Sequence, residues 1–496
     1  MSLRSALSRN LFIVAAATAL AATRIGVTLF VPPVIGLANN GDFERVMVPV
    51  GLGYLTDRFD ERYFGWALTE FSIVEPRPRP IIHVTSETPL AAISVLAVRL
   101  VSSRPILDIR VLGALHTLLF LLGMALVLRA CRDRAPSSRW LAAAMLVFFF
   151  TDVGYTAAFH SLYGQTASLL SFLMLSGIVG LAVRRGGITA GQLCAYFLSA
   201  AWFVGSKPQE CLQAPLLAVL GILLASSPVS PGRARRLAVV FAVGLCGLAV
   251  WLYARPSVRA IHDVGVYHTV FMELLPNSPD PAGDLRALGL DPALVRYSGH
   301  HAYLPDAPLE HPDFRAQFFD RFGYRELVGF YVLRPARLLD RFVRAGRSAF
   351  RLRPANLGNF SHASGAAPKS MSMHSGTWSR WRMKLGVHGL LTIALLFAGN
   401  LAAAARGWRS SSWRGRRFRE GILLLVLIGT LEFAVCSLAD YLGDLPRHLY
   451  MFQAIFDLIL IADAAWLADL VASRGKWRKT NRRRAPIFLR TASTIG

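Results

Sequence analysis

Ten apolar stretches alternate with polar connections along most of this 496-residue chain. A helix that crosses a bilayer needs about 20 apolar residues, because the hydrocarbon core is about 30 Å thick. Most of the stretches reach or approach that length, and 54% of all residues are hydrophobic. The pattern therefore predicts an all-α membrane protein with about ten transmembrane helices. These are expected at residues 11–37, 110–128, 140–151, 166–183, 190–205, 211–226, 237–253, 385–405, 421–438 and 448–470.

Two long polar segments, 39–109 and 254–384, separate groups of these stretches. In the first, Thr88–Val101 is apolar but too short to span, which predicts a helix at the membrane interface. In the second, residues 327–350 alternate apolar side chains with arginines at helical spacing, which predicts an amphipathic surface helix. Such a helix would anchor the chain or bring its arginines to a lipid phosphate. Residues 355–384, rich in Ser, Gly, Ala and Met, are expected to form a mobile segment or lid.

Positive charge is unevenly distributed along the chain, whose formal net charge is +24. Six segments on one side of the predicted bundle, the two terminal ones included, hold 25 Lys and Arg residues. Three short connections on the other side hold only Lys207 and Arg447. The positive-inside rule then places both termini in the cytoplasm of a multi-pass inner-membrane protein. The basic tail is expected to anchor the topology and meet anionic membrane lipid, so no nucleic acid partner is predicted.

The topology divides the chain into six parts. The expected division is a first transmembrane helix at 1–38, an extracytoplasmic loop at 39–109, helices two to seven at 110–253, a large extracytoplasmic loop at 254–384, helices eight to ten at 385–472 and a basic cytoplasmic tail at 473–496.

Several kinds of site have no support in the sequence. The five cysteines avoid the bodies of both long loops, so no disulfide framework is expected there. No CxxC spacing occurs, and His300, His301 and His311 lack acidic partners at ligand spacing, so no metal site is predicted. A glycine-rich phosphate loop is also absent from the sequence, which argues against direct use of a nucleotide. No cofactor is therefore predicted with certainty, and a divalent cation is left open.

An acidic residue, Asp42, follows the first predicted helix directly, in the run Asn39-Asn40-Gly41-Asp42-Phe43. Asn, Gly and Asp at these positions predict a turn, because Gly tolerates positive φ and Asn and Asp bond their own backbone. The turn would present the Asp42 carboxylate at the membrane surface. It could serve catalysis, or it could cap the start of a helix.

The short outer connections are polar in a way that suggests a binding site. One contains Asp152, Tyr155, His160, Tyr163 and Gln165, and the others contain Lys207 with Gln209 and Arg447 with His448. Cations at membrane depth are usually functional or paired. Lys and Arg at the outer face suit a phosphate group, with Arg able to contact it through two N–H groups. Arg447 could alternatively anchor the last helix at the interface.

The order of these motifs resembles the polytopic glycosyltransferases of the GT-C fold, and is similar to the glycan-biosynthesis hexose transferases of the WsfD type. The resemblance rests on Asn40-Gly41-Asp42-Phe43, Gly154-Tyr155, Tyr163-Gly164-Gln165, Lys207-Pro208-Gln209, Val270-Phe271, Asp284-Leu285, Leu288-Gly289-Leu290-Asp291-Pro292 and Arg447-His448. It implies an extracytoplasmic active site, a sugar donor on a polyprenyl phosphate, and Asp42 as catalytic base or acceptor-positioning carboxylate. Two departures are that Phe43 separates Asp42 from Glu44, and that Gln165 stands where an acid is expected.

The resulting hypothesis is an inverting hexosyltransferase that uses a polyprenyl-phosphate sugar and a cell-surface glycan or lipid-linked acceptor. Asp42 is predicted to be the catalytic residue, with Arg447, His448 and Lys207 at the donor phosphate. The predicted substrate-binding residues are Glu44, Asp152, Tyr155, His160, Tyr163, Gln165 and Gln209. The alternatives are an O-antigen ligase or polymerase, which would not explain Asp42, and a flippase or transporter, which would need charged groups inside the bundle.

Overall fold

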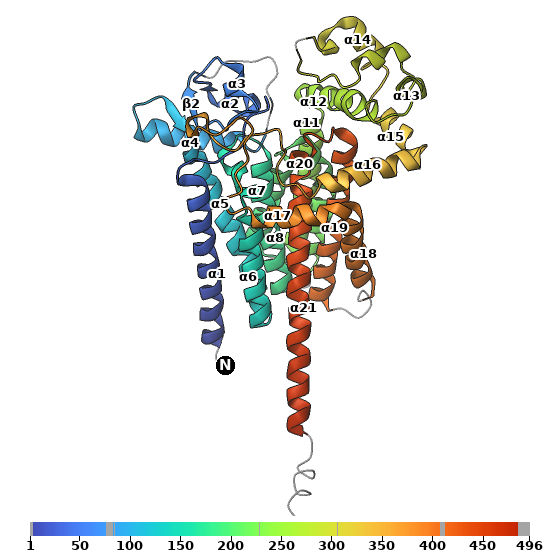
Figure 1. Ribbon diagram of the computed structural model, residues 1–496. Coiled ribbons are helices and arrows are strands. Elements are labelled where there is room, and N and C mark those ends of the chain that lie inside the picture. Colours follow the sequence, from blue (N-terminus) through green and yellow to red (C-terminus); the bar gives the residue numbers. More distant parts are fainter. Residues whose placement is uncertain are drawn as a thin grey trace, which may run out of the picture.

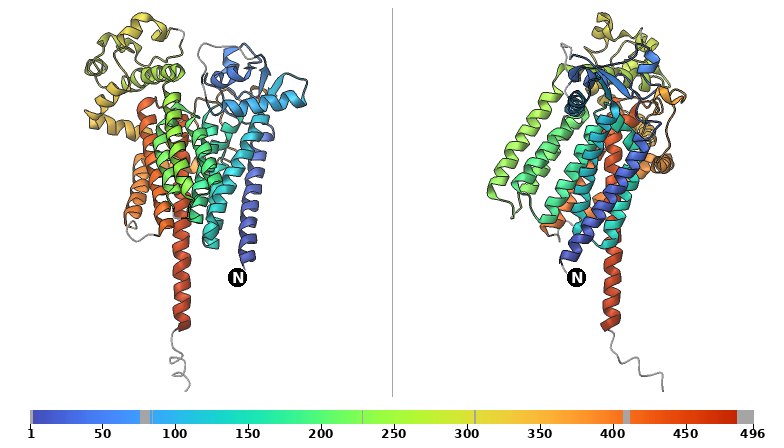
Figure 2. Two further views of the ribbon diagram at one scale, coloured as in Figure 1. Left: turned by 180° about the vertical axis from the view of Figure 1, so that it is seen from behind. Right: turned by 90° about the vertical axis from the view of Figure 1, so that its left-hand side faces the viewer.

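The structure is a computed structural model that describes residues 3–75, 83, 85–227, 229–304, 306–406 and 412–484. Its long helices run roughly side by side and carry two further assemblies at one end (Figure 1, Figure 2). The bundle consists of α1 (Leu3–Ile25) with the π-helical turn η1 (Gly26–Phe30), α5 (Ile109–Ala130), α6 (Pro136–Phe150), α8 (Gln165–Arg185), α9 (Ala190–Val204), α10 (Ala214–Ala225), α11 (Gly232–Tyr253), α18 (Gly389–Arg406), α19 (Trp413–Ala439) and α21 (Tyr450–Arg484).

Each of the ten apolar stretches contains a helix, although residues 31–37 at the end of the first stretch are not helical, and the prediction of an all-α membrane protein is confirmed. Among the described residues, seven helices are long and apolar enough to cross a membrane, and a bent pair makes eight. In that pair, α6 is followed at an angle of 53° by α7 (Val153–Thr156) and η3 (Ala157–His160). The expected number of ten is thus higher than this test supports. One reason is that α9 has only 15 residues.

The two ends of the described chain lie at the same end of the bundle. In Figure 1, α1 begins and α21 ends at the bottom, whereas the segments that follow α1 and α11 lie at the top. This arrangement agrees with an even number of crossings. The end that carries the two large segments is called the outer end below.

The first outer segment packs a small sheet beside short helices. Its strands β1 (Leu52–Gly53), β2 (Glu70–Ile73) and β3 (Ile106–Asp108) are antiparallel, with Leu107 opposite Phe71. The expected interfacial helix is α4 (Thr88–Val101), whose Ile93, Leu96 and Leu100 are exposed on one face. This segment also contains α2 (Glu44–Val50) and α3 (Phe59–Arg62).

The second outer segment has a hydrophobic core of its own. Phe271, Phe314 and Phe318 pack together in it with ring centroids 5.1–6.1 Å apart. Its elements are α12 (Pro256–Tyr267), η5 (His268–Leu274), α13 (Pro281–Ala287), η6 (Pro292–Tyr297), η7 (Pro308–Glu310), α14 (Pro312–Gln317), α15 (Tyr324–Val332), α16 (Pro335–Ser348), η8 (His362–Ser364), α17 (Thr377–Leu385) and η9 (Gly386–His388). Short elements η2 (Cys131–Asp133), η4 (Pro208–Gln213) and α20 (Leu445–His448) complete the fold.

The amphipathic helix expected over 327–350 is divided into α15 and α16 at Pro335, and three arginines of α16 form ion pairs with carboxylates of the protein. Arg341 is fully buried, pairs with Glu273 at 2.8 Å, and donates to the backbone oxygen of Ser437 at 2.6 Å. Arg344 also pairs with Glu273, at 2.7 Å. Arg341 therefore holds α16 against the end of α19, and Arg341 and Arg344 together hold it against η5.

The segment 355–384, expected to be mobile or a lid, packs against the bundle near its two ends, whereas most side chains of residues 362–369 are exposed. Asn359 is buried and donates to the backbone oxygen of Gly36 at 2.8 Å. Further along, the Ser379 backbone N–H donates to the Asp152 carboxylate at 3.1 Å. Composition alone predicted mobility because Ser and Gly are typical of linkers, but in this segment they allow close packing.

Candidate active site

A cavity of about 410 Å³ opens at the outer end of the bundle, between the two outer segments. Part of its lining is polar and comes from residues 40–45, 163–165, 206–209 and 440–448. Another part is apolar and comes from α11, α12, α15 and α19. Its residues include Tyr253, Ile261, Val264, Val328, Ala434, Val435 and Leu438.

The predicted turn after the first span is confirmed, and side-chain oxygens hold it. Asn39 Oδ1 accepts from the backbone N–H groups of Gly41 at 2.8 Å and Phe43 at 3.2 Å. Gly41 has φ +106°, a conformation that favours glycine. The following helix α2 begins at Glu44 without a side-chain cap, so Asp42 does not act as a helix cap.

Asp42 lies in a chain of ion pairs that joins the two ends of the sequence. Its Oδ2 is 2.6 Å from Arg447 Nη1, and its Oδ1 is 2.9 Å from Arg45 Nη2. Arg447 in turn donates from Nε to Asp444 Oδ1 at 3.1 Å. Burial alone would raise the pKa of Asp42, but the two guanidinium groups lower it to about 2. The carboxylate is therefore ionised near neutral pH.

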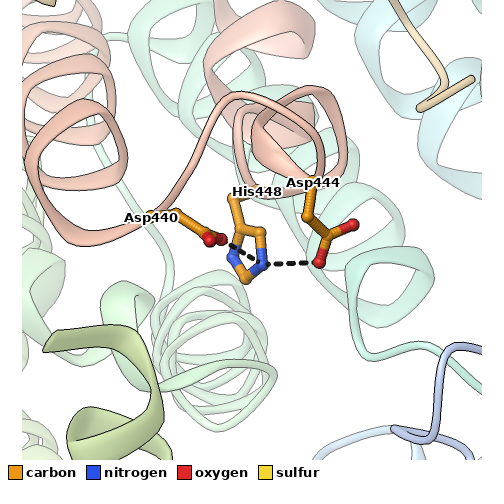
Figure 3. A group of neighbouring side chains, drawn as sticks. All are labelled: Asp440, Asp444 and His448. Atoms are coloured by element: carbon orange, nitrogen blue, oxygen red, sulfur yellow. Dashed lines mark hydrogen bonds and ion pairs between the residues drawn. The ribbon is translucent and has the colours of Figure 1, made fainter. Parts of the chain in front are cut away.

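The same chain continues to His448, whose ring lies between two carboxylates (Figure 3). His448 Nε2 is 2.7 Å from Asp440 Oδ2 and 3.3 Å from Asp444 Oδ2. These three residues can place ligand atoms within 4.8 Å of one another, a donor set that suits a divalent cation. Arg447 Nη2, however, lies 3.2 Å from His448 Nε2 and donates to the same Asp444 oxygen. A cation and the guanidinium would therefore compete for the same ligand atoms.

Lys207 is the cation in this cavity whose charge is not committed to a partner. It directly precedes η4 and lines the cavity, and it forms no ion pair or side-chain hydrogen bond within the described residues. The buried carboxyl groups of Glu210 and Glu432 are near enough to interact electrostatically with its ammonium group. This proximity offsets part of the cost of placing a cation at membrane depth.

The sequence matches the YfdI N-terminal transmembrane domain over residues 3–484. This chain belongs to the YfdI family. No curated protein matches its sequence. The WsfD-type relationship predicted from the motifs stays a prediction.

Among solved structures, this YfdI-family chain is similar to the archaeal oligosaccharyltransferase AglB from Archaeoglobus fulgidus in complex with an inhibitory peptide and a dolichol-phosphate. The identity is 11% and the TM-score 0.42, with 96% of this chain and 52% of that one covered. A second structure, the Archaeoglobus fulgidus oligosaccharyltransferase tethered with an acceptor peptide, gives 11% identity and a TM-score of 0.40 over 91% and 49% of the two chains. The YfdI-family chain thus spans about half the length of these enzymes.

The cavity of this YfdI-family protein brings together seven of the eleven predicted site residues. These are Asp42, Tyr163, Gln165, Lys207, Gln209, Arg447 and His448. The Tyr163 hydroxyl donates to the backbone oxygen of Ala38 at 2.8 Å, and the Arg447 guanidinium lies 4.8 Å above its ring. Gln165 is 3% exposed, and its Oε1 has no hydrogen-bond partner within the part of the chain that the structure describes.

Four predicted substrate-binding residues lie outside the cavity lining: Glu44, Asp152, Tyr155 and His160. Asp152 caps α7 by accepting from the Gly154 N–H at 2.8 Å. The Tyr155 hydroxyl donates to the buried Asp457 at 2.8 Å. These two residues hold α7, α17 and α21 together. The sequence suggested a binding loop here because binding sites and buried polar networks use the same residue types.

The other two residues outside the cavity have partners of their own. His160 Nδ1 lies 2.8 Å from the backbone oxygen of Ile35, and its ring packs edge-on against Phe30. Glu44 accepts from the Tyr63 hydroxyl at 2.8 Å. Both contacts fix the first outer segment in place.

Sequence reasoning missed several residues of the site. Arg45 could have been found, because it stands only three residues after Asp42, in the first turn of α2, within reach of the Asp42 carboxylate. Asp440 and Asp444 lie in a polar connection, but no sequence motif marked them as site residues. The ring-bearing residues of the opposite wall come from separate segments: His268, His301, Tyr303 and Tyr441. Only the tertiary structure brings these residues together.

Proposed function

We propose that this chain is an inverting glycosyltransferase that moves a hexose from a polyprenyl-phosphate donor to a cell-surface glycan or its lipid-linked precursor. The observation that carries the proposal is that an ionised carboxylate, Asp42, and an uncommitted ammonium, Lys207, line one cavity at the outer end of the bundle. Transfer from a sugar phosphate needs an acceptor for one proton and a cation for the leaving phosphate. Asp42 and Lys207 supply these two groups.

The apolar part of the lining supports a lipid-linked donor. It is contributed by the outer ends of the bundle helices α11 and α19 and by α12 and α15 of the second outer segment, where an isoprenoid chain could reach it from the bilayer. Pro208 and Leu212 line the same wall as Lys207. A lipid whose phosphate lies at Lys207 would therefore find apolar neighbours for its isoprenoid chain. A free nucleotide sugar has no apolar chain that could bind this surface.

The reaction assigned to the cavity is a single displacement at the anomeric carbon. The acceptor hydroxyl oxygen forms a bond to C1 as the bond from C1 to the phosphate oxygen breaks, and the electron pair leaves with the phosphate next to Lys207. The hydroxyl proton passes to Asp42. A carboxylate with a pKa near 2 suffices, because the attacking oxygen becomes strongly acidic only as the new bond forms. Arg447 and Arg45 orient Asp42 toward the cavity.

A transfer assay with defined donors tests this function. Purified protein in proteoliposomes receives a labelled polyprenyl-phosphate hexose or the matching nucleotide sugar, with polysaccharide from the source cell as acceptor. Glucose, galactose and mannose are tested in turn. We expect label in the polysaccharide from a lipid donor alone. Transfer from the nucleotide sugar, or from no donor, would overturn the proposal.

The Lys207→Gln substitution is expected to raise the KM for the lipid donor by roughly 10- to 150-fold. A hydrogen bond to a charged group is worth about 1.5–3 kcal/mol, which corresponds to that factor. Initial rates at limiting donor concentration measure it. Lys369→Gln is the matched control, because Lys369 is exposed on the second outer segment and does not line the cavity. Equal donor KM values for the two variants would remove Lys207 from the phosphate site.

The orientation of the chain in the membrane is a separate prediction, based on the uneven distribution of Lys and Arg. Ser364→Cys, on the second outer segment, should react with a membrane-impermeant maleimide in intact cells. Gly232→Cys, at the start of α11, should react only after lysis. Position 232 accepts a side chain freely, since an added Cβ there meets no atom within 4 Å. The reverse labelling pattern would put the cavity on the cytoplasmic side.

A further inference from the structure

Four rings form a wall of the cavity that the proposed donor chemistry does not use. His268 of η5, His301, Tyr303 and Tyr441 all line the cavity. The ring centroids of His268 and His301 are 4.4 Å apart, and those of His301 and Tyr303 are 5.5 Å apart. Tyr441 packs edge-on against His268 at 5.1 Å. We call these four residues the aromatic wall.

Backbone hydrogen bonds keep both imidazoles of the aromatic wall uncharged. The Ala302 N–H donates to His268 Nε2 at 3.2 Å, and the Tyr303 N–H donates to His301 Nδ1 at 3.3 Å. A ring nitrogen that accepts a hydrogen bond carries no proton, so each ring is in a neutral tautomer. Burial lowers the pKa of both histidines, that of His268 to about 4, which agrees with this assignment. The wall is therefore a neutral aromatic surface, although Asp440 and Asp444 are near.

Tyr303 is open to a ligand. Its side chain is 57% exposed even though it lines the cavity, and the neighbouring Leu304 is 45% exposed. Asp42 and Arg45 both act electrostatically on the Tyr303 hydroxyl, so the ring lies near the carboxylate that is assigned to catalysis. The wall thus extends from the aqueous surface to the proposed reaction centre.

The chemistry of the wall matches a saccharide. The faces of aromatic rings carry partial negative charge and attract the polarised C–H groups on the apolar face of a pyranose. The Tyr303 and Tyr441 hydroxyls can form hydrogen bonds with sugar hydroxyls. A phosphate would find no cation on this wall, and an isoprenoid chain already has the apolar lining on α12 and α19.

We propose that the aromatic wall is the binding subsite for the acceptor saccharide, which stacks on Tyr303 and directs one hydroxyl to Asp42. This inference rests on the proposed glycosyl transfer and adds the side from which the acceptor enters. The donor reaches the cavity from the bilayer along the apolar lining, and the acceptor reaches it from water past Tyr303. The two substrates therefore meet between Lys207 and the wall.

Saturation-transfer NMR on the purified full chain, without any donor, tests the subsite. The probes are the methyl glycosides of glucose, galactose, mannose and rhamnose. Tyr303→Ala should weaken binding of the glycoside that binds wild-type protein by about 2- to 13-fold, the value of an aromatic contact. Tyr303→Phe should bind more tightly than Tyr303→Ala, because it keeps the ring and loses only the hydroxyl. Phe59→Ala is the control, since Phe59 is 68% exposed on α3 and does not line the cavity.

Kinetics give the second readout. Tyr303→Ala should raise the acceptor KM and leave the KM for the lipid donor unchanged. An unchanged acceptor affinity, a rise in donor KM alone, or no saturation transfer to any glycoside from wild-type protein would each overturn the subsite. Failure of the glycosyl-transfer proposal is distinguishable, because the NMR experiment measures saccharide binding in the absence of transfer.

Discussion

Asp42→Asn should lower the rate of hexose transfer by roughly 10²- to 10⁴-fold while the protein still folds and inserts. Asparagine keeps the shape of the side chain and the turn preference but cannot accept the proton of the attacking hydroxyl. Folding should tolerate the change because Arg447 retains its second carboxylate, Asp444, within hydrogen-bonding distance. The measurement is single-turnover transfer of labelled hexose from a polyprenyl phosphate, with thermal unfolding of the same preparation.

Glu44→Gln is the matched control for Asp42→Asn. Glu44 lies two residues further along, but its carboxylate accepts from the Tyr63 hydroxyl and does not line the cavity. We expect a small change in rate. A nearly normal rate for Asp42→Asn would overturn the catalytic assignment, and a larger effect of Glu44→Gln would move it to the other carboxylate.

The pH dependence gives a further check on Asp42. Since its pKa lies near 2, below the usual value of 3.8, the carboxylate is charged above about pH 4. Its ion pairs therefore stabilise the fold above that pH, and this stabilisation is lost as the pH falls through the folded-state value. Asp42 should produce no acid limb in the rate profile between pH 5 and 8.

The second large effect is expected from Arg447→Ala, which should destabilise the protein by about 3–5 kcal/mol and abolish transfer. Removing the guanidinium leaves the buried Asp444 and the partly buried Asp42 without their common partner. Arg447→Lys should recover part of the stability, because it restores the charge but not the several N–H donors. Thermal unfolding and donor-saturated transfer rates measure the two effects separately.

Arg344→Ala is the comparison for Arg447→Ala. Arg344 also pairs with a buried carboxylate, Glu273 at 2.7 Å, but lies outside the cavity. It should lose stability without a specific loss of transfer. A double-mutant cycle of Asp42→Asn with Arg447→Ala should be strongly non-additive, since each side chain is the other's partner. Additive effects would contradict the ion-pair chain as the basis of the site.

The fold was predictable from the sequence because hydrophobic length and helical periodicity report directly on membrane helices. The turn that holds Asp42 was predictable for a similar reason, since Asn39 and Gly41 determine their own local backbone. These features depend on residues close together in the chain. The bend after α6 and the shortness of α9 altered the number of spans because hydropathy alone does not report where a helix is broken.

The content of the cavity was only partly predictable, because it depends on contacts between distant segments. Tyr155 and Tyr163 look alike in the sequence, yet Tyr155 bonds the buried Asp457 and Tyr163 lines the cavity. The arginines of α16 suggested a lipid-facing helix, but Arg341 is covered by the end of α19. Amphipathic periodicity shows that a helix has two faces, and it does not show what covers each one.

The contact between Asp42 and Arg447 has a consequence for how the protein is made. The two residues are 405 positions apart, so the ribosome must translate nearly the whole chain before the pair can form. Until α20 is in place, Arg45 is the remaining ion-pair partner of Asp42 among the described residues. Assembly of the cavity is therefore expected to be one of the last events of biogenesis, and a chain released before its final helix should insert without a complete cavity.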